Sequence, residues 1–356
     1  MKKISLLLML SCVLSLQAQL RNNDVYEVTE MEQSRVRREI RIPNVDDYKV
    51  LKCDFHTHTV FSDGKVWPDT RVMEAWQEGL DAVAITDHIE YLPHKEIIKA
   101  DLNESYKIAK KAADASGFIV IKGTEITRSK PLGHLNALFI NDVMPMDVED
   151  PLKAIDEAVR QGAFIMWNHP GWPDDKSTFY PVHEELIKAG KIHGLEVFNH
   201  MEYYPACFDW AMEHNLAFMA NTDSHDPISN NYGRENQMRP MTLVLAKERS
   251  EASIKEALFA KRTMAFFNGE LAGKPEHLKG LLKASLKIRV INEKLVEVTN
   301  ISDITYQATG GKKLYIFPAG KTISFSVPAF DTVFTVENCH TGTGQKLTVT
   351  ASDFDF

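Results

Sequence analysis

The sequence predicts an α/β barrel followed by a small all-β domain. From about residue 48 to 275, short apolar runs alternate with amphipathic helical segments, which is the pattern of βαβ units around a parallel sheet. About seven such units over this length favour a barrel over an open sheet, a choice that periodicity alone does not make. From residue 281 to 356 strand-like alternation replaces the helical pattern and indicates an antiparallel β domain.

The expected barrel strands are apolar runs that end at polar residues. The helices between them include residues 151–162, where Asp150 can cap the first turn, Pro151 suits that turn, and Gly162 closes the helix. Two further helices are expected at 68–79 and 250–261. The strands cover residues 48–54, 80–86, 117–123, 163–167, 194–198, 216–220, 241–245 and 263–267.

The C-terminal β domain carries no group of metal-binding residue types. We therefore expect it to pack against the barrel or to join two copies of the chain as a homo-oligomer. Its expected strands cover residues 286–291, 295–298, 314–317, 324–327 and 333–336.

The first residues have the order of a secretory signal peptide. Two lysines precede an apolar run over 4–16, and Ala18 offers a small residue for cleavage, so residues 1–19 are predicted to be removed. Cys12 would suit lipidation, but the apolar run continues past it, which favours simple cleavage. Residues 20–47 are polar and form an exposed entry segment. These features predict a periplasmic or secreted protein without stable membrane insertion.

Composition sets bounds on size and partners. The chain has 356 residues, a formal net charge of -8 and 44% hydrophobic residues, enough for one large domain or one large and one small. The acidic balance argues against a broad nucleic-acid surface, so no nucleic-acid partner is expected. Beyond the signal peptide, Cys53, Cys207 and Cys339 are scattered and are expected to be buried free thiols, although one disulfide would be compatible with an oxidising compartment.

One stretch of the sequence contains the first candidate metal-binding side chains. The run from Cys53 to Gly64 places His56 and His58 two residues apart at a strand end, so both imidazoles face the same side. Asp63 follows in a turn and can bring a carboxylate back to them. The Asp223-Ser224-His225 segment repeats this pattern far down the chain, which argues against two isolated surface histidines.

Histidines and carboxylates follow strand after strand, at the end where a barrel places its active-site loops. Nitrogen and oxygen ligands without cysteine suit zinc, manganese or iron, and their number exceeds the need of one four-coordinate ion. We expect two to three divalent ions, with Glu125 as the bridging carboxylate. The candidate ligands are His56, His58, Asp63, His88, Glu125, His134, His169, Asp223 and His225.

These residues, with their neighbours, resemble the motifs of the polymerase-and-histidinol-phosphatase (PHP) domain over about residues 50 to 270. The resemblance implies a distorted (β/α)7 barrel, here over 48–275, that holds up to three metal ions. Some family members have histidine in place of Asp63, and the harder carboxylate would favour manganese or iron there. The matching motifs are His56-Thr57-His58, Ser62-Asp63-Gly64, Thr86-Asp87-His88, Gly123-Thr124-Glu125, Gly133-His134, Asn168-His169-Pro170 and Asp223-Ser224-His225.

The resemblance also implies how the ligands are shared. The first ion would be held by His56, His58, Glu125 and Asp223. The second would be held by Glu125, His134 and His169, and the third by Asp63, His88 and His225.

The predicted activity is hydrolysis of a phosphomonoester or a small phosphodiester by a metal-activated hydroxide. Glu125 and Asp223 would act in catalysis, and Arg234 and Arg239 follow Asp223 closely enough to bind the phosphoryl oxygens. Two alternatives stay open: a carbon-centred metallohydrolase acting on an amide or lactone, and a non-catalytic metal-binding scaffold protein.

Residues around the ligands receive weaker assignments. Asp87 is either a supporting residue for an imidazole or a helix cap. His200 and Tyr204 are expected to shape the pocket and Trp172 to form part of its wall, whereas His183 is expected on the surface.

Overall fold

The computed structural model describes residues 35–174, 176–233, 237–326, 328–329 and 331–354. The chain divides into two compact units, and the secondary structure below belongs to the second, Arg37–Phe356. The predicted signal peptide and Arg234 lie outside the described residues. Within the described ranges, no helix is both long and apolar enough to cross a membrane.

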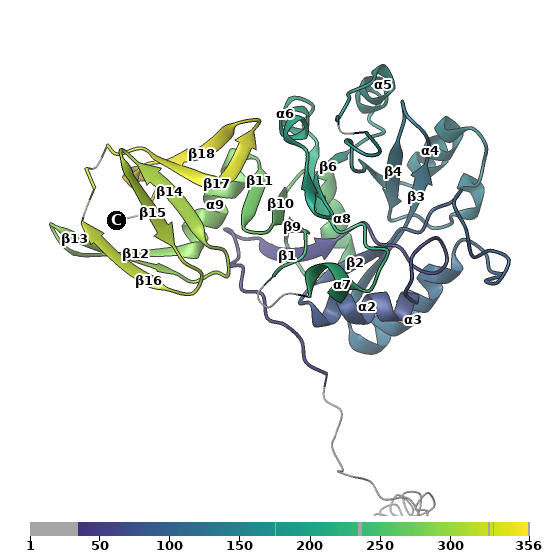
Figure 1. Ribbon diagram of the computed structural model, residues 1–356, viewed down its shortest axis with the longest axis horizontal. Helices are drawn as coiled ribbons and strands as arrows, with labels where there is room; N and C mark the ends of the chain where they lie inside the picture. The colour runs from purple at the N-terminus through teal and green to yellow at the C-terminus, as the bar shows by residue number, and fades with distance from the viewer. Residues whose placement is uncertain (1–34, 175, 234–236, 327, 330, 355–356) are drawn as a thin grey trace, which may run out of the picture. The chain divides into compact units, whose positions relative to one another are not determined.

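The central sheet is mixed rather than wholly parallel (Figure 1). One parallel group joins β1, β2 and β3, and a second joins β5, β6 and β8, while β4 runs antiparallel between β3 and β5. The bounds are β1 (Lys49–Asp54), β2 (Ala82–Ile85), β3 (Ile119–Thr127), β4 (His134–Leu138), β5 (Phe164–Trp167), β6 (Gly194–Asn199), β7 (Glu202–Tyr203) and β8 (Ala217–Asn221).

The sheet continues on the other side of β1 through antiparallel strands. These are β9 (Met241–Ala246), β10 (Thr263–Phe267) and β11 (Glu270–Gly273). No backbone ladder joins β8 to β9 in the part of the chain that the structure describes; instead the backbone N–H and C=O of Ala220 each lie 3.0 Å from Thr242 Oγ1. The predicted α/β class is confirmed, and closure into a barrel stays a prediction.

The antiparallel strand β4 is the main departure from the expected βαβ rhythm. It alternates His134 and Asn136 with the buried apolar residues Leu135 and Ala137, so it lacks the continuous apolar run by which the other strands are recognised. Its polar residues are explained by their position: His134 is a candidate ligand, and Asn136 Oδ1 accepts a hydrogen bond of 2.9 Å from the amide of Asn168, which also donates to Glu125.

Helices connect the strands, largely as predicted. Asp150 Oδ1 accepts a hydrogen bond of 3.0 Å from the backbone N–H of Leu152 and so caps α4, and Ser250 caps α8. The helices are α2 (Pro68–Gln77), α3 (Glu104–Ser116), α4 (Pro151–Arg160), α5 (Pro181–Lys188), α6 (Pro205–Glu213), α7 (Ile228–Tyr232), α8 (Glu251–Phe259) and α9 (Pro275–Ser285).

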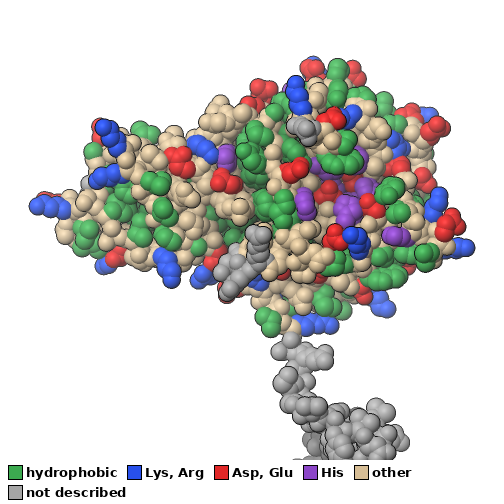
Figure 2. Space-filling view, in the orientation of Figure 1, with side chains coloured by type: hydrophobic (Ala, Val, Ile, Leu, Met, Phe, Trp, Pro, Cys, Tyr) green, Lys and Arg blue, Asp and Glu red, His purple; other side chains and the backbone are tan. Residues whose placement is uncertain are grey.

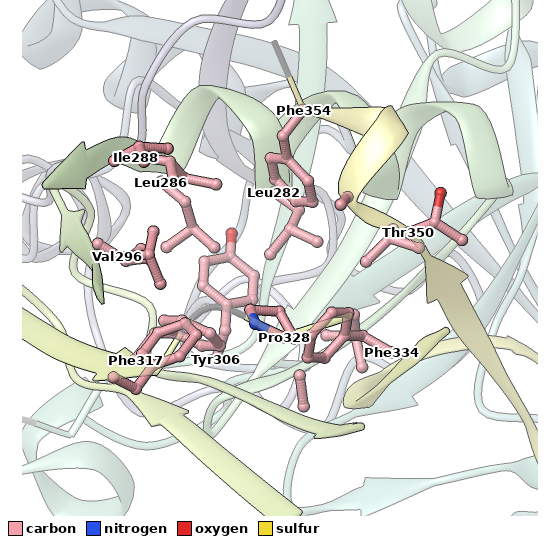
Figure 3. Close-up of a pocket in the computed structure, with 17 residues that line it drawn as sticks. Leu282, Leu286, Ile288, Val296, Tyr306, Phe317, Pro328, Phe334, Thr350 and Phe354 are labelled. Carbon is pink, nitrogen blue, oxygen red and sulfur yellow. The ribbon is translucent and has the colours of Figure 1, made fainter. Parts of the chain in front are cut away.

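The C-terminal region forms strands, some of which continue the large sheet while others form a second sheet. Strand β17 pairs in parallel with β11, so the large sheet runs on into this region, and the predicted boundary near residues 275–281 falls within α9. A three-stranded sheet of β12, β13 and β16 faces it, with an apolar cavity of about 230 Å³ between them (Figure 3). The strands are β12 (Leu286–Asn292), β13 (Leu295–Asn300), β14 (Tyr306–Gly310), β15 (Lys313–Phe317), β16 (Thr322–Ser326), β17 (Phe334–Gly342) and β18 (Gln345–Val349).

The three cysteines of the described chain are buried free thiols, as predicted. Burial raises the pKa of Cys53 above its usual range, so this thiol stays protonated at neutral pH. The cysteines therefore contribute to the core rather than to the metal-binding region.

Candidate metal centre

Two segments far apart in sequence meet at the end of β1. The backbone N–H of His58 donates to the carbonyl of Ser224 at 3.1 Å, and that of Asp223 donates to the carbonyl of His56 at 2.9 Å. Thr57 and Ser224 form a parallel bridge. The two His- and Asp-containing motifs thus lie side by side, which places four candidate ligands in one spot.

A first group forms around His56 and His58, whose side chains are fully buried. Glu125 Oε2 lies 3.2 Å from Nε2 of each imidazole. Asp223 Oδ1 lies 3.2 Å from Nε2 of His56 and 3.1 Å from Nε2 of His58. Two imidazoles and two carboxylates therefore converge, as the first predicted ligand set requires.

A second group of candidate ligands surrounds the other carboxylate oxygen of Glu125. Its Oε1 lies 2.8 Å from His134 Nδ1 and 3.6 Å from His169 Nε2. Asp223 Oδ2 lies 3.7 Å from the same nitrogen of His169. Because its two oxygens face different groups of histidines, Glu125 has the geometry of a bridging carboxylate.

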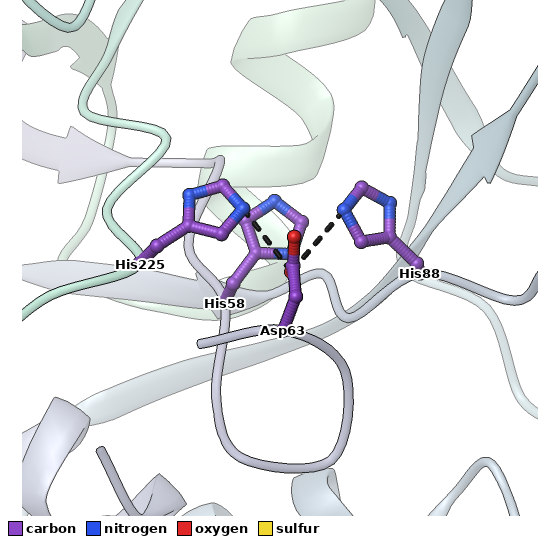
Figure 4. A group of neighbouring side chains, drawn as sticks. All are labelled: His58, Asp63, His88 and His225. Atoms are coloured by element: carbon purple, nitrogen blue, oxygen red, sulfur yellow. Dashed lines mark ion pairs between the residues drawn. The ribbon is translucent and has the colours of Figure 1, made fainter. Parts of the chain in front are cut away.

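A third group gathers around Asp63 (Figure 4). Asp63 Oδ1 lies 3.1 Å from His225 Nε2 and 3.4 Å from His88 Nε2. His58 also belongs here, because its Nδ1 lies 3.9 Å from the same oxygen and its ring stacks on those of His88 and His225, with ring centroids 4.4 Å and 4.2 Å apart. His58 thus faces the first group with one nitrogen and the third with the other.

Several atoms of these groups fit a bound cation. His58 Nε2, Asp63 Oδ1, His134 Nδ1 and Asp223 Oδ1 are buried and have no hydrogen-bond partner within the described parts of the chain. Buried polar atoms are almost always hydrogen-bonded, so atoms left unsatisfied need another partner. Nitrogen and oxygen donors of this kind, pointing toward one another, suit divalent zinc, manganese or iron.

The carboxylates and imidazoles stabilise each other's charged forms. Burial disfavours a charged ring, but the adjacent carboxylates of Asp223 and Glu125 outweigh it and raise the pKa of His58 to about 9. Burial likewise opposes ionisation of Glu125, yet the nearby His56 and His88 hold the pKa of its carboxyl well below the usual range. Protons thus balance the carboxylates in the metal-free protein, and a cation would replace them.

The ring orientations of three histidines are fixed by contacts at Nδ1, which in His88 also lies 3.1 Å from Glu125 Oε2. Nδ1 of His56 lies 3.0 Å from Glu196 Oε1, Nδ1 of His88 lies 2.6 Å from Thr127 Oγ1, and Nδ1 of His225 lies 2.8 Å from the carbonyl oxygen of Asp223. Hydrogen bonds of this kind set the tautomer and direct the other nitrogen forward.

Sequence reasoning missed Glu196. Its carboxylate is fully buried and also accepts hydrogen bonds from the backbone N–H of His169 at 2.8 Å and from the amides of Asn199 and Asn221 at 2.8 and 2.9 Å. The available signal was one charged residue inside an apolar strand, because such a charge needs several partners.

Asp87 has a supporting role and does not cap a helix. Its carboxylate accepts hydrogen bonds from the backbone N–H and hydroxyl of Thr59 at 2.7 and 2.8 Å, and from the Ser62 hydroxyl at 2.8 Å. It thereby anchors the turn that carries Asp63.

Arg239 makes no hydrogen bond or ion pair with a candidate ligand in the described part of the chain. Its side chain is 1% exposed and forms an ion pair with the buried Asp54, and it lies 3.2 Å from Thr222 Oγ1. This position gives no support to a direct phosphate contact by Arg239. Arg234, the other predicted arginine, lies outside the described residues.

The ligand groups open into a cavity of about 590 Å³, and Figure 2 shows the histidines gathered in the hollow. His200, Tyr204 and Trp172 line it, as expected. The described lining contains no lysine or arginine. The surface assignment of His183 is wrong: the side chain is buried, stacks on Trp167 with ring centroids 3.7 Å apart, and lies with Nε2 2.8 Å from the carbonyl oxygen of Leu132.

Comparison with known proteins identifies the family. The model of the PHP domain family matches residues 54–298. The chain belongs to the PHP family. A crystal structure from Bacteroides vulgatus, a two-domain protein containing a predicted PHP-like metal-dependent phosphoesterase, is similar to this PHP chain with 36% identity and a TM-score of 0.85, covering 89% of this chain and 99% of that one.

Two further proteins are similar to this PHP chain. An uncharacterised protein of Methanocaldococcus jannaschii is 31% identical over 187 residues, which is 50% of this chain and 83% of that protein. A lesion-specific endonuclease from Pyrococcus furiosus matches with 15% identity and a TM-score of 0.41, over 64% of this chain and 59% of that one. The second similarity is too low to carry over a fold or a substrate.

Proposed function

We propose that this PHP-family chain is a metal-dependent phosphoesterase that hydrolyses a phosphomonoester or a small phosphodiester. The observation that carries the proposal is the position of Glu125, whose two oxygens face two different groups of histidines at the base of an open cavity. A purely structural ion would be enclosed, whereas these ligands border a cavity large enough for a small substrate.

The ligand assignment follows the three groups, with two to three zinc, manganese or iron ions as the proposed cofactors. Glu125 and Asp223 contribute to the first and second sites, and Asp63, His88 and His225 form the third together with His58. When bound, such ions lower the pKa of water, so that hydroxide is available at neutral pH, and neutralise phosphoryl oxygens.

The protein's own residues supply orientation. Glu196, Thr127 and the carbonyl of Asp223 hold His56, His88 and His225 with their Nε2 atoms forward. Asn168 donates to Glu125 Oε1 at 3.1 Å and so fixes the shared carboxylate. This preorganisation reduces the rearrangement that substrate binding and proton transfer would otherwise require.

Carbon-centred hydrolysis of an amide or lactone is a second candidate. The observation that favours it is the lack of lysine and arginine from the described lining of the cavity, since phosphoryl transfer usually draws on a cation besides the metals. Arg234 remains the candidate for that cation under the main proposal. A scaffold role has less support, because a scaffold needs no open cavity beside its ligands.

The proposal is tested with the full-length mature protein loaded in turn with zinc, manganese and iron. Elemental analysis is expected to find two to three ions per chain, and a panel of chromogenic phosphomonoesters and phosphodiesters should show metal-dependent cleavage. Preferred cleavage of a lactone or amide in the same panel would establish the second candidate instead. Full metal loading with no turnover of any ester, amide or lactone would support the scaffold.

The remaining proposals concern location and assembly. We propose a periplasmic or secreted protein on the basis of the N-terminal sequence, and a small phosphorylated substrate rather than a nucleic acid on the basis of net charge. A homo-oligomer through the C-terminal strands would be detected by the mass of the purified protein in solution.

A further inference from the structure

A second hollow adjoins the cavity of about 590 Å³ that the candidate ligands border, which we call the metal cavity. It has a volume of about 420 Å³ and shares Thr127, His134 and Trp172 with the metal cavity, while Tyr180 lines this hollow alone of the two. We call it the side pocket. Because His134 belongs to both hollows, a group attached to a phosphoryl bound at the second ligand group would lie next to the side pocket.

Trp172 presents an exposed aromatic ring at the junction of the two hollows. Its ring packs against His134 with centroids 5.1 Å apart and against the edge of His169 at 5.6 Å. Its backbone N–H donates to the carbonyl of His169 at 2.9 Å. The residue is therefore held by two candidate ligands, yet 55% of it stays exposed.

The charges of the side pocket are paired. Arg128 forms an ion pair with Glu90 and donates to the carbonyl of Val148 at 3.0 Å. Lys130 lies 2.7 Å from Asp174. Because each of these cations already has a carboxylate partner, an additional anion would have to compete with that partner.

We infer that the side pocket binds the leaving group of the phosphoester and that this group is a flat ring without a second negative charge, stacked on Trp172. An aryl group and a nucleobase share this chemistry, since each offers a π-face to an aromatic side chain. The inference rests on the proposed phosphoesterase activity and names its substrate class.

The test compares benzyl phosphate with cyclohexylmethyl phosphate. Both leave as primary alcohols and have similar size, but only the first has a flat ring. The metal-loaded wild type is expected to cleave benzyl phosphate with about threefold or greater kcat/KM. Trp172→Ala should lower kcat/KM for benzyl phosphate by about tenfold and abolish the preference, whereas Trp172→Phe should retain most of it.

Trp67→Ala is the matched control, because Trp67 is 51% exposed and does not line either hollow. It should leave both substrates unaffected. Calorimetric binding of benzylphosphonate and cyclohexylmethylphosphonate gives a readout apart from turnover, and the wild type should bind the flat analogue more tightly. Metal content should be equal in all variants.

The remaining outcomes separate the inference from the proposed function. If both phosphates are cleaved equally and Trp172→Ala changes neither, the side pocket does not bind a ring, while the phosphoesterase proposal stands.

Preference for a ringless bisphosphate such as propane-1,3-diyl bisphosphate would assign the side pocket to an anion and overturn the inference. Adenosine 5′-monophosphate, added as a further substrate, distinguishes a nucleobase from a simple aryl group. No cleavage of any phosphoester by the loaded protein would overturn both.

Discussion

The buried carboxylate of Glu196 lies 3.0 Å from Nδ1 of His56, on the side of the ring that faces away from the other ligands. The opposite nitrogen of His56 points at Glu125 and Asp223. Glu196 thereby links the interior of strand β6 to the ligand at the end of β1, and one side chain sets the tautomer of an imidazole that a metal ion would use.

Replacing this carboxylate should weaken metal binding without removing a ligand. Glu196→Gln is expected to lower metal affinity by about ten- to a hundredfold, because the amide cannot hold the Nδ1 proton of His56 as a carboxylate does. The measurement is a competition titration against a chelator. Glu270→Gln is the matched control, since Glu270 pairs with His340 at 2.6 Å in another carboxylate–histidine contact. Equal affinity in wild type and Glu196→Gln would show that the contact serves folding alone.

Glu125 is expected to be the most sensitive ligand. Glu125→Ala removes both bridging oxygens, so metal content and turnover should fall together, while the circular dichroism spectrum should keep the wild-type shape. Glu125→Gln tests the charge at nearly constant volume and should lose metal to a smaller extent. Normal metal content in both variants would contradict the bridging assignment.

The sequence predicts which side chains lie together better than it predicts the sheet. Most of the nine candidate ligands follow or end a strand, and the structure brings all nine together in overlapping groups. His134 begins its strand instead, and it lies at the same edge because β4 runs antiparallel between β3 and β5. Strand β4 was not predicted because His134 and Asn136 interrupt its apolar pattern. Glu196 was not predicted because its role depends on contacts with residues distant in sequence, such as His56 and Asn221.

Arg239 illustrates the same limit for charged residues. Its nearness to Asp223 in sequence indicated a phosphate-binding side chain, but its guanidinium pairs with the buried carboxylate of Asp54. Proximity along the chain does not determine which side of a strand end a long side chain occupies. Spatial information was needed to distinguish an internal ion pair from a substrate contact.

The structure predicts a stability effect for Arg239. Arg239→Met should lower the free energy of unfolding by about 3 kcal/mol, because it leaves the buried carboxylate of Asp54 without its partner. Urea unfolding measures the change. Arg160→Met, which breaks the exposed pair with Glu157, should cost less than about 1 kcal/mol. Unchanged stability of Arg239→Met together with slower phosphoester cleavage would restore the substrate-binding role.

The last prediction concerns the pH dependence of stability and uses His183, which is not one of the candidate ligands. Burial lowers the pKa of His183 to about 4 in the folded protein, against about 6.5 for an exposed histidine. Between these values the unfolded chain binds the additional proton, so stability must decrease as the pH falls from about 6.5 to 4 and is fully present above 6.5.

The difference between wild type and His183→Gln isolates this contribution from that of the other histidines. Glutamine can still donate to the carbonyl of Leu132, which lies 2.8 Å from Nε2 of His183, but it does not titrate. Relative to the variant, wild type should lose up to about 3 kcal/mol across this interval. Urea unfolding of both proteins at several pH values from 4 to 8 measures the change, and parallel pH profiles would show that His183 keeps its ordinary pKa in the fold.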